Sequence, residues 1–210
     1  ISVDTSGEPL HRRGYRRDPG PAPLREDLAR ALVIASGWDR RSPLVDPMAG
    51  SGTIAIEAAL LASGRAPGAK RSFAFQSAPC FDQALWTRTR EAAPKESDAP
   101  TIFASDRDAA SVARTRANAE RAGVTLEIAQ ASLSEAPGLS DAQAVVSNPP
   151  WGERLEGDPT AVHRALGALI RDHARGAAVG PPEIGTALGL PSQLMTDARG
   201  TKVCFFVRLA

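Results

Sequence analysis

Residues 44–63 read LVDPMAGSGTIAIEAALLAS, and this stretch decides the fold. Leu44 and Val45 form a short apolar run that ends at Asp46, which is typical of a buried strand. Apolar side chains then recur at helical spacing from Thr53 to Ser63, and the glycine that follows can end this helix. The stretch therefore predicts a strand, a glycine-containing loop and a helix that packs closely against a sheet.

Short apolar runs and amphipathic stretches continue to alternate along the chain, which favours an α/β domain with a mainly parallel sheet. Residues 1–21 are expected to form a hairpin or linker segment, and residues 22–210 the domain itself. Residues 65–100 contain four prolines and read as a loop insertion with one short helix. Further strands are expected at 101–104, 124–128, 144–146 and 203–209, and further helices at 23–36, 84–92, 108–122 and 159–174.

The composition is that of one ordinary globular domain. The chain has 210 residues, 42% of them hydrophobic and 23% charged, which is enough to bury a full core. It has no apolar run near the ~20 residues that span a membrane, and no signal-peptide pattern. It does not begin with Met, so we expect a piece of a longer protein. The two cysteines lack metal-ligand spacing, so we expect no metal and a cytoplasmic location.

Arginines gather near the amino terminus, although the net charge of the whole chain is only +1. Such a stretch can contact the phosphates of a nucleic acid, and it can equally be a solvated surface in an arginine-rich chain. The candidate RNA-binding residues are Arg12, Arg13, Arg16 and Arg17.

The loop after the first strand is a candidate cofactor site. Gly50 and Gly52 lack a Cβ atom, so the backbone can turn sharply and approach a ligand. The next helix presents free N–H groups and the positive end of its dipole, which suit a small carboxylate. The lysine of a phosphate loop and the third glycine of a dinucleotide loop are missing. An ordinary tight strand–helix turn is the alternative. The candidate cofactor residues here are Asp46, Met48, Ala49, Gly50, Ser51, Gly52 and Thr53.

Asp106 ends the second expected strand, where an acidic side chain accepts hydrogen bonds from ribose hydroxyls in doubly wound folds. A carboxylate can accept two such bonds at once. The alternative role is that of a loop acid or a helix N-cap, but Asp108 is better placed for that cap. Asp106 and its neighbour Arg107 therefore join the candidate cofactor residues.

The string Asn148-Pro149-Pro150-Trp151 follows an apolar run, at the carboxyl end of a central strand, where open α/β sheets bind ligands. Two successive prolines fix φ and remove two backbone donors, which leaves a rigid row of acceptors. The Asn148 side-chain oxygen and the Pro149 carbonyl can accept hydrogen bonds from one amine, while Trp151 can stack on a base. A rigid turn with an aromatic plug is the alternative.

The two strings together predict methyl transfer from S-adenosylmethionine to the exocyclic nitrogen of a nucleobase. Such a nitrogen is a poor nucleophile, because its lone pair is conjugated to the ring. Two acceptors would hold its hydrogens, turn the lone pair toward the methyl group and stabilise the positive charge that develops on nitrogen. The candidate catalytic residues are Asn148, Pro149, Pro150 and Trp151, and Asn148 also counts as a cofactor contact.

Five stretches in order resemble the class I methyltransferases that make N2-methylguanine in RNA, in particular the bacterial 23S ribosomal RNA guanine-N2 methyltransferases and their THUMP-associated relatives. The resemblance implies a Rossmann-like sheet of seven mainly parallel strands with helices on both faces, an N-terminal hairpin appendage and a last antiparallel strand. It implies S-adenosylmethionine as cofactor, S-adenosylhomocysteine as product and ribosomal or transfer RNA as substrate. A THUMP RNA-binding domain would precede residue 1. The stretches are residues 6–16 with 22–28, then 46–58, 67–86, 148–155 and 187–190.

Carried over position by position, the resemblance implies that the glycine loop lines the methionine part of the cofactor and that Asp106 holds the ribose. Pro23 and Leu24 would lie near the cofactor. Two positions depart from the family pattern. Trp151 stands where a tyrosine is usual, which keeps stacking but loses the phenol hydroxyl. Ser132 stands where many members have an aspartate that contacts the adenine amine, so Ser132 would have to serve.

Two other functions stay open at this stage. We call residues 148–151 the amine clamp. The same clamp would also serve the amine of adenine or cytosine in DNA and the amide of a protein glutamine. A domain that binds the cofactor or RNA without catalysis is a different class, and the departure at Ser132 keeps it open. The intact pair of acceptors in the clamp argues against that second class.

Overall fold

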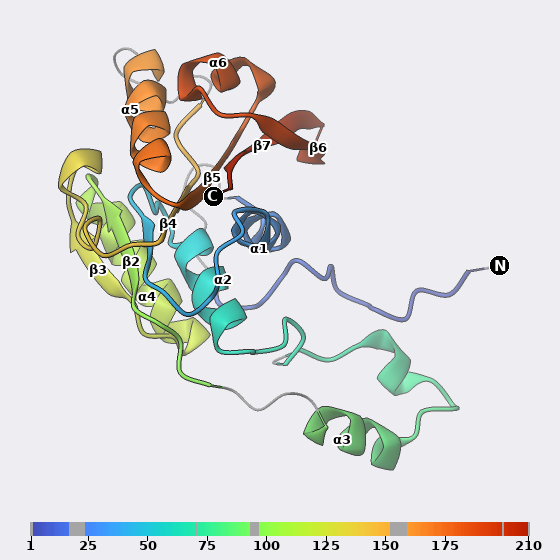
Figure 1. Cartoon of the computed structure of the whole chain (residues 1–210). Helices are drawn as coiled ribbons and strands as arrows, with labels where there is room; N and C mark the ends of the chain where they lie inside the picture. Colours follow the sequence, from blue (N-terminus) through green and yellow to red (C-terminus); the bar gives the residue numbers. More distant parts are fainter. Residues whose placement is uncertain are drawn as a thin grey trace.

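The computed structural model describes residues 2–16, 24–69, 71–92, 97–151, 159–198 and 200–209. Within these residues, seven strands form one sheet in the order β3-β2-β1-β4-β5-β7-β6 (Figure 1). Strands β1 to β5 pair in parallel, and β7 runs antiparallel to both of its neighbours. The strands are β1 (Leu44–Asp46), β2 (Ile102–Asp106), β3 (Glu127–Gln130), β4 (Ala144–Ser147), β5 (Arg175–Gly180), β6 (Ser192–Ala198) and β7 (Thr201–Arg208).

Helices cover both faces of this sheet, as predicted. Side chains of β4 alternate between two cores, because successive residues of a strand point to opposite faces. Ala144 and Val146 pack with α1 and α2, whereas Val145 packs with α5 and α6. No described helix is long and apolar enough to cross a membrane. The helices are α1 (Glu26–Ala35), α2 (Thr53–Ala62), α3 (Gln83–Glu91), α4 (Ala109–Ala122), α5 (Pro159–Asp172) and α6 (Gly185–Leu188).

The central strands are buried on both sides, which explains their short, continuous apolar runs. Every residue of β1 and of β4 is buried. β1 pairs with β2 on one side and with β4 on the other, so Val45 lies between Phe103 and Val145. The carboxyl ends of these three strands therefore meet at one edge, and the sequence places Asp46, Asp106 and Asn148 there.

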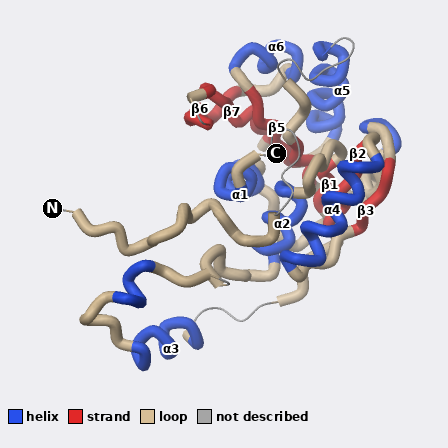
Figure 2. Tube along the Cα trace, turned by 180° about the vertical axis from the view of Figure 1, so that it is seen from behind, coloured by secondary structure: helices blue, strands red, loops and turns tan. Residues whose placement is uncertain are grey.

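Of the expected hairpin or linker at the amino terminus, the hairpin is not found in residues 2–16, which contain no strand. Their backbone finds its partners in the insertion instead: the carbonyls of Thr5 and Ser6 accept hydrogen bonds from the backbone N–H groups of Phe75, at 3.1 Å, and Ala74, at 3.4 Å. Figures 1 and 2 show this extended segment beside the insertion, away from the sheet. Because these partners are distant in the sequence, no local turn signal could disclose the pairing.

The insertion has its own small aromatic cluster and no buried residue in either of its helical segments. The rings of Phe73 and Phe75 stack with centroids 5.4 Å apart, and Trp86 meets both edge-on. Helix α3 begins after Asp82, whose carboxylate accepts a hydrogen bond from the Leu85 N–H. The expected short helix within 65–100 is therefore confirmed.

Tight packing of α5 on α6 generates the first prediction. A Cβ atom on Gly167 would lie 1.9 Å from the backbone carbonyl oxygen of Leu188. We expect Gly167→Ala to lower the free energy of unfolding by about 1–3 kcal/mol, as overpacked cores do. Arg164→Ala on the exposed face of the same helix should change it by less than about 0.5 kcal/mol. Urea unfolding measures both, and equal stability of the two variants would contradict the packing argument.

Candidate functional site

A pocket of about 840 Å³ opens at the carboxyl ends of β1, β2 and β4. It gathers most of the residues that the sequence singled out, although they come from widely separated parts of the chain. Gly52 and Trp151 do not line it, and Pro23 lies outside the described residues. The predicted residues in the lining are Leu24, Asp46, Met48, Ala49, Gly50, Ser51, Thr53, Asp106, Arg107, Ser132, Asn148, Pro149 and Pro150.

One wall of the pocket was missed by the sequence reasoning. Helix α5 contributes several small side chains to the lining, and the turn after β3 adds the apolar side chain of Leu133. The α5 residues lie on the helix that follows the amine clamp, and the small size of the alanines leaves room for a flat ligand. Their sequence signal was only the alternation of alanine with larger residues on an amphipathic helix. The residues are Ala161, Val162, Ala165, Ala168, Leu169 and Asp172.

The glycine loop is shaped by two left-handed residues and by the close approach of α4. Gly50 has φ +57°, and a Cβ there would meet nothing among the described residues within 4 Å. Gly52 has φ +81°, and its Cβ would lie 2.8 Å from the Thr115 methyl carbon. Gly50 therefore gives a ligand access to the backbone, whereas Gly52 lets α4 pack behind the loop.

Helix α4 satisfies the carbonyl groups of this loop. The Thr115 hydroxyl donates to the Gly50 carbonyl at 3.1 Å, and the Asn118 amide donates to the Ser51 carbonyl at 2.8 Å. Both residues are buried. Neither was a candidate from the sequence, although polar residues three positions apart on a buried helix face are a signal of such bracing. Most N–H groups of the loop are also engaged within the protein: those of Met48, Ala49, Gly50 and Gly52 donate to Asp46, Ser105, Asp106 and Ala49.

Asp106 ties β2 to the glycine loop and keeps its carboxylate at the pocket. One oxygen accepts from the Gly50 N–H at 2.9 Å, and the other accepts from the Asp108 N–H at 3.0 Å. Asp108 is the N-cap of α4, accepting from the N–H groups of Ala110 and Ser111, so the predicted cap is confirmed, while the ribose role of Asp106 stays a prediction. Each Asp106 oxygen has a further lone pair that can accept a ligand hydroxyl.

Asp46 has a buried carboxylate whose two oxygens differ in their hydrogen bonding. Oδ1 accepts from the Ser147 hydroxyl at 2.8 Å and from the Met48 N–H at 3.4 Å, while Oδ2 has no hydrogen-bond partner among the described residues. Burial raises the pKa of Asp46 to about 7, a shift that the two hydrogen bonds oppose and the nearby Asp106 charge reinforces. An unpartnered acidic oxygen in a pocket lining suits an ammonium group of a ligand.

The amine clamp is held from two sides. The Trp151 indole N–H donates to the Asn148 side-chain oxygen at 3.2 Å, which fixes the orientation of the amide. His163 of α5, which is 4% exposed, lies with Nε2 2.8 Å from the Pro150 carbonyl oxygen. A carbonyl can only accept, so Nε2 carries the proton. His163 was not a candidate from the sequence. The indole N–H gives Trp151 a polar handle in place of the tyrosine hydroxyl, while its stacking on a base stays a prediction.

Ser132 lines the pocket at the turn after β3. Its hydroxyl donates to the Glu135 carboxylate at 2.6 Å, which orients the hydroxyl oxygen and leaves its lone pairs to accept. An acceptor is what an adenine amine requires, so the geometry is compatible with the role that the sequence gave to this serine.

The arginines near the amino terminus have different surroundings. Arg12 is exposed and pairs with Glu8, and Arg17 lies outside the described residues. The side chains of Arg13 and Arg16 are only 11% and 9% exposed, and they pair with Glu57 and Glu26 inside the domain. The structure thus gives no support to a phosphate contact by Arg13 or Arg16, and for Arg12 that contact stays a prediction.

Comparison with protein families and curated proteins finds clear relatives. A family model described as RMKL-like, methyltransferase domain, matches residues 13–178. The ribosomal RNA large subunit methyltransferase K/L of Aliivibrio salmonicida is 40% identical over 189 residues, which cover 84% of this chain and 27% of that protein. The chain therefore spans about a quarter of the length of this curated relative.

Two solved structures agree with the family match. The crystal structure of SMU.472 complexed with SAH has a TM-score of 0.84 and 29% identity, and the match covers 99% of this chain and 57% of that one. A predicted N6-adenine-specific DNA methylase from Listeria monocytogenes has a TM-score of 0.76 and 29% identity, covering 97% of this chain and 56% of that one. The predicted Rossmann-like class I methyltransferase fold is confirmed.

The buried Asp46 generates a prediction on stability. Unfolded, its pKa is near the ordinary 3.8, and folded it is about 7, so the folded state binds more protons between these values. Stability should therefore fall as pH rises from 4 to 7, by at most roughly 4 kcal/mol for this group. Asp46→Asn should flatten this slope, whereas Asp98→Asn, at an exposed loop acid, should keep it. Urea unfolding across pH measures the slope, and an unchanged slope in Asp46→Asn would refute the assignment.

Proposed function

This chain belongs to the family of RMKL-like methyltransferase domains, and we propose that it transfers a methyl group from S-adenosylmethionine to the N2 amine of guanine in ribosomal RNA. One observation carries the proposal: the acceptors of the clamp, Asn148 and Pro149, line the same pocket as the glycine loop and Asp106. Ribosomal RNA is the class of substrate in the name of the 40% identical relative. Transfer RNA is the alternative acceptor within the same chemistry.

The pocket suits each part of S-adenosylmethionine. The first turn of α2 would receive the carboxylate, because a helix N-terminus favours an anion. The unpartnered oxygen of Asp46 would receive the ammonium group. Asp106 would accept from the ribose hydroxyls, and Ser132 from the adenine amine. The volume of about 840 Å³ lies within the range of cofactor pockets and leaves space for a base beside the cofactor.

The clamp residues activate the amine without a strong base. When bound, the cofactor supplies a methyl group on a positively charged sulfur. The Asn148 oxygen and the Pro149 carbonyl accept the two amine hydrogens, so the nitrogen lone pair points toward that methyl group. The same acceptors stabilise the positive charge that develops on nitrogen as the new bond forms. The resulting ammonium loses a proton to water, and S-adenosylhomocysteine is the second product.

Trp151 and His163 act on the clamp rather than on the reacting atoms. The Trp151 N–H donates to one lone pair of the Asn148 side-chain oxygen and so holds the amide in place. The second lone pair of that oxygen accepts from the substrate amine. His163 fixes the Pro150 carbonyl, and through it the turn that carries the Pro149 carbonyl. Preorganised acceptors cost no reorganisation during the reaction, which is why such bracing raises rates.

The substrate is a macromolecule, so parts of the protein outside the pocket take part in recognition. A guanine must leave its stack to reach the clamp, as bases do in other enzymes that modify them. The K/L relative is much longer than this chain, and an RNA-binding domain of the THUMP type within such a longer protein would supply most of the RNA contact. Arg12 is the exposed member of the described candidate RNA-binding arginines. Ribosomal RNA as substrate places the reaction in the cytoplasm.

The adenine amine of DNA is a second candidate acceptor. The favouring observation is the similarity to the Listeria protein described as an adenine-specific DNA methylase. Adenine N6 and guanine N2 are both conjugated exocyclic amines, and the clamp has acceptors for either. Only the identity of the methylated base separates the two functions.

The acceptor prediction uses labelled S-adenosylmethionine with three substrates: unmodified ribosomal RNA, adenine-rich DNA and protein. We expect label in RNA alone, in N2-methylguanosine after digestion. Asn148→Ala should lower the transfer rate by about 100-fold or more, as loss of one preorganised partner does. Arg164→Ala, on the exposed face of α5, is the control for handling and folding. Label in N6-methyladenine would make DNA methylation the function, and full activity of Asn148→Ala would refute the clamp.

Asp106 and the clamp should contribute differently to the affinity for the cofactor. Calorimetry with S-adenosylhomocysteine should show binding by the parent chain, a loss of at least about tenfold in Asp106→Ala, and near-parent affinity in Asn148→Ala. The tenfold loss corresponds to one or two hydrogen bonds to a charged group. Asp141→Ala, at an exposed acid away from the pocket, is the matched control. Equal affinity of Asp106→Ala and Asp141→Ala would contradict the ribose role.

A further inference from the structure

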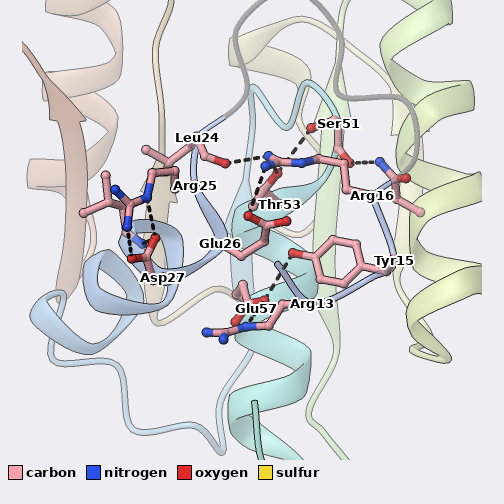
Figure 3. Close-up of polar contacts among 12 residues, drawn as sticks. Arg13, Tyr15, Arg16, Leu24, Arg25, Glu26, Asp27, Ser51, Thr53 and Glu57 are labelled. Carbon is pink, nitrogen blue, oxygen red and sulfur yellow. Dashed lines mark hydrogen bonds and ion pairs between the residues drawn. The ribbon is translucent and has the colours of Figure 1, made fainter. Parts of the chain in front are cut away.

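The Arg16 side chain joins two walls of the pocket from behind. Its Nη1 donates to the Leu24 carbonyl oxygen at 2.6 Å and makes a longer contact of 3.5 Å with the Thr53 hydroxyl. Its Nη2 donates to the Glu26 carboxylate at 3.0 Å. Figure 3 shows this guanidinium between the segment that enters α1 and the first turn of α2. The fork of donors in an arginine suits such a three-way contact.

Two of the three residues that Arg16 contacts line the pocket, whereas Arg16 itself and Glu26 do not. Leu24 and Thr53 both line it, and Arg16 is absent from the lining. Leu24 precedes α1, and Thr53 is the first residue of α2. Their relative position therefore depends on a side chain that a cofactor in the pocket would not touch.

We propose that Arg16 is a positioning residue for the cofactor: it sets how closely the Leu24 wall and the α2 N-terminus approach each other, and thereby the affinity for S-adenosylmethionine and S-adenosylhomocysteine. This inference rests on the proposed function, because it concerns the cofactor of that same pocket. It also replaces the contact with RNA that the sequence suggested for Arg16, since a side chain 9% exposed and paired with Glu26 has little access to phosphate.

The segment that carries Arg16 is anchored independently. We call residues 13–16 the N-terminal strap. The Tyr15 hydroxyl donates to the Glu57 carboxylate at 3.2 Å, and Arg13 lies 3.5 Å from the same carboxylate. Arg121 donates to the Tyr15 carbonyl at 2.7 Å. Figure 3 shows Arg13 and Tyr15 converging on Glu57, one turn below Thr53 on α2.

Arg13 provides a matched control for Arg16. Both arginines lie on the strap, are nearly buried and pair with a buried glutamate. Arg13 contacts Glu57 and the Leu10 carbonyl, neither of which lines the pocket, whereas Arg16 contacts the lining residues Leu24 and Thr53. A loss of folding alone should therefore affect both variants, whereas a loss of cofactor affinity should follow only from Arg16.

The experiment measures S-adenosylhomocysteine affinity by calorimetry for the parent chain, Arg16→Gln, Arg16→Lys and Arg13→Gln. Each is measured well below its melting temperature, with circular dichroism to verify folding. We expect Arg16→Gln to raise Kd roughly threefold to thirtyfold, the range for residues that modulate a site without contact to its ligand. Arg16→Lys should recover part of the affinity, because an ammonium group still reaches Glu26 or Leu24. Arg13→Gln should melt earlier and bind within about twofold of the parent.

Three results would overturn the inference. The first is a Kd for Arg16→Gln within about twofold of the parent value. If Arg16→Gln does not fold, the same result in each of the single variants Arg16→Lys and Glu26→Gln counts instead. The second is equal weakening in Arg13→Gln and Arg16→Gln, which would mean that the strap acts through folding alone. The third is weaker RNA binding by Arg16→Gln with unchanged Kd for S-adenosylhomocysteine. A parent chain that binds no S-adenosylhomocysteine would instead refute the proposed cofactor and this inference with it, so the two failures are distinguishable.

Discussion

The loop between β1 and α2 can keep its shape at the pocket only if its carbonyl groups find hydrogen-bond partners. Helix α4 meets that requirement through Thr115 and Asn118, which donate to the Gly50 and Ser51 carbonyls. Buried backbone groups without partners would cost free energy comparable to a lost hydrogen bond. The required proximity of α4 leaves no room for a Cβ at Gly52. The glycine in the loop and the polar residues of α4 therefore require each other.

A second constraint is the burial of Glu57 in an otherwise apolar helix. Its carboxylate is fully buried and its pKa is raised by that burial, while the charges of Arg13 and Arg30 act in the opposite direction. Such buried ion pairs contribute little net stability compared with apolar residues of similar size, and removing one partner is costly. We therefore interpret the buried group of Glu57, Arg13 and Arg30 as fixing the position of the N-terminal strap rather than as stabilising the core.

The sequence predicted the parts of the molecule that have local causes. The strand, glycine loop and helix of residues 44–63 were located closely, and so was the cap at Asp108. Strands β5 and β6 were not located, because β5 is mostly glycine and alanine and β6 is largely exposed at a sheet edge. The surroundings of Arg13 depend on Glu57, which lies far along the chain, and the choice between hairpin and linker for residues 2–16 likewise depended on distant partners.

The pocket residues are positioned in two ways, by strand pairing within the sheet and by the side chain of Arg16, and the two have different consequences for catalysis. Asp46 and Asp106 end β1 and β2, and the clamp follows β4. The hydrogen bonds between these adjacent parallel strands fix the register of Val45 with Phe103 and with Val145. Backbone ladders do not shift in small steps, since a slip of one residue turns every side chain to the other face. The reacting groups are thus placed by the sheet, whereas the Leu24 wall is placed by one side chain of the strap. A change at Arg16 should therefore alter how tightly the cofactor is held and leave the line between the methyl group and the amine intact.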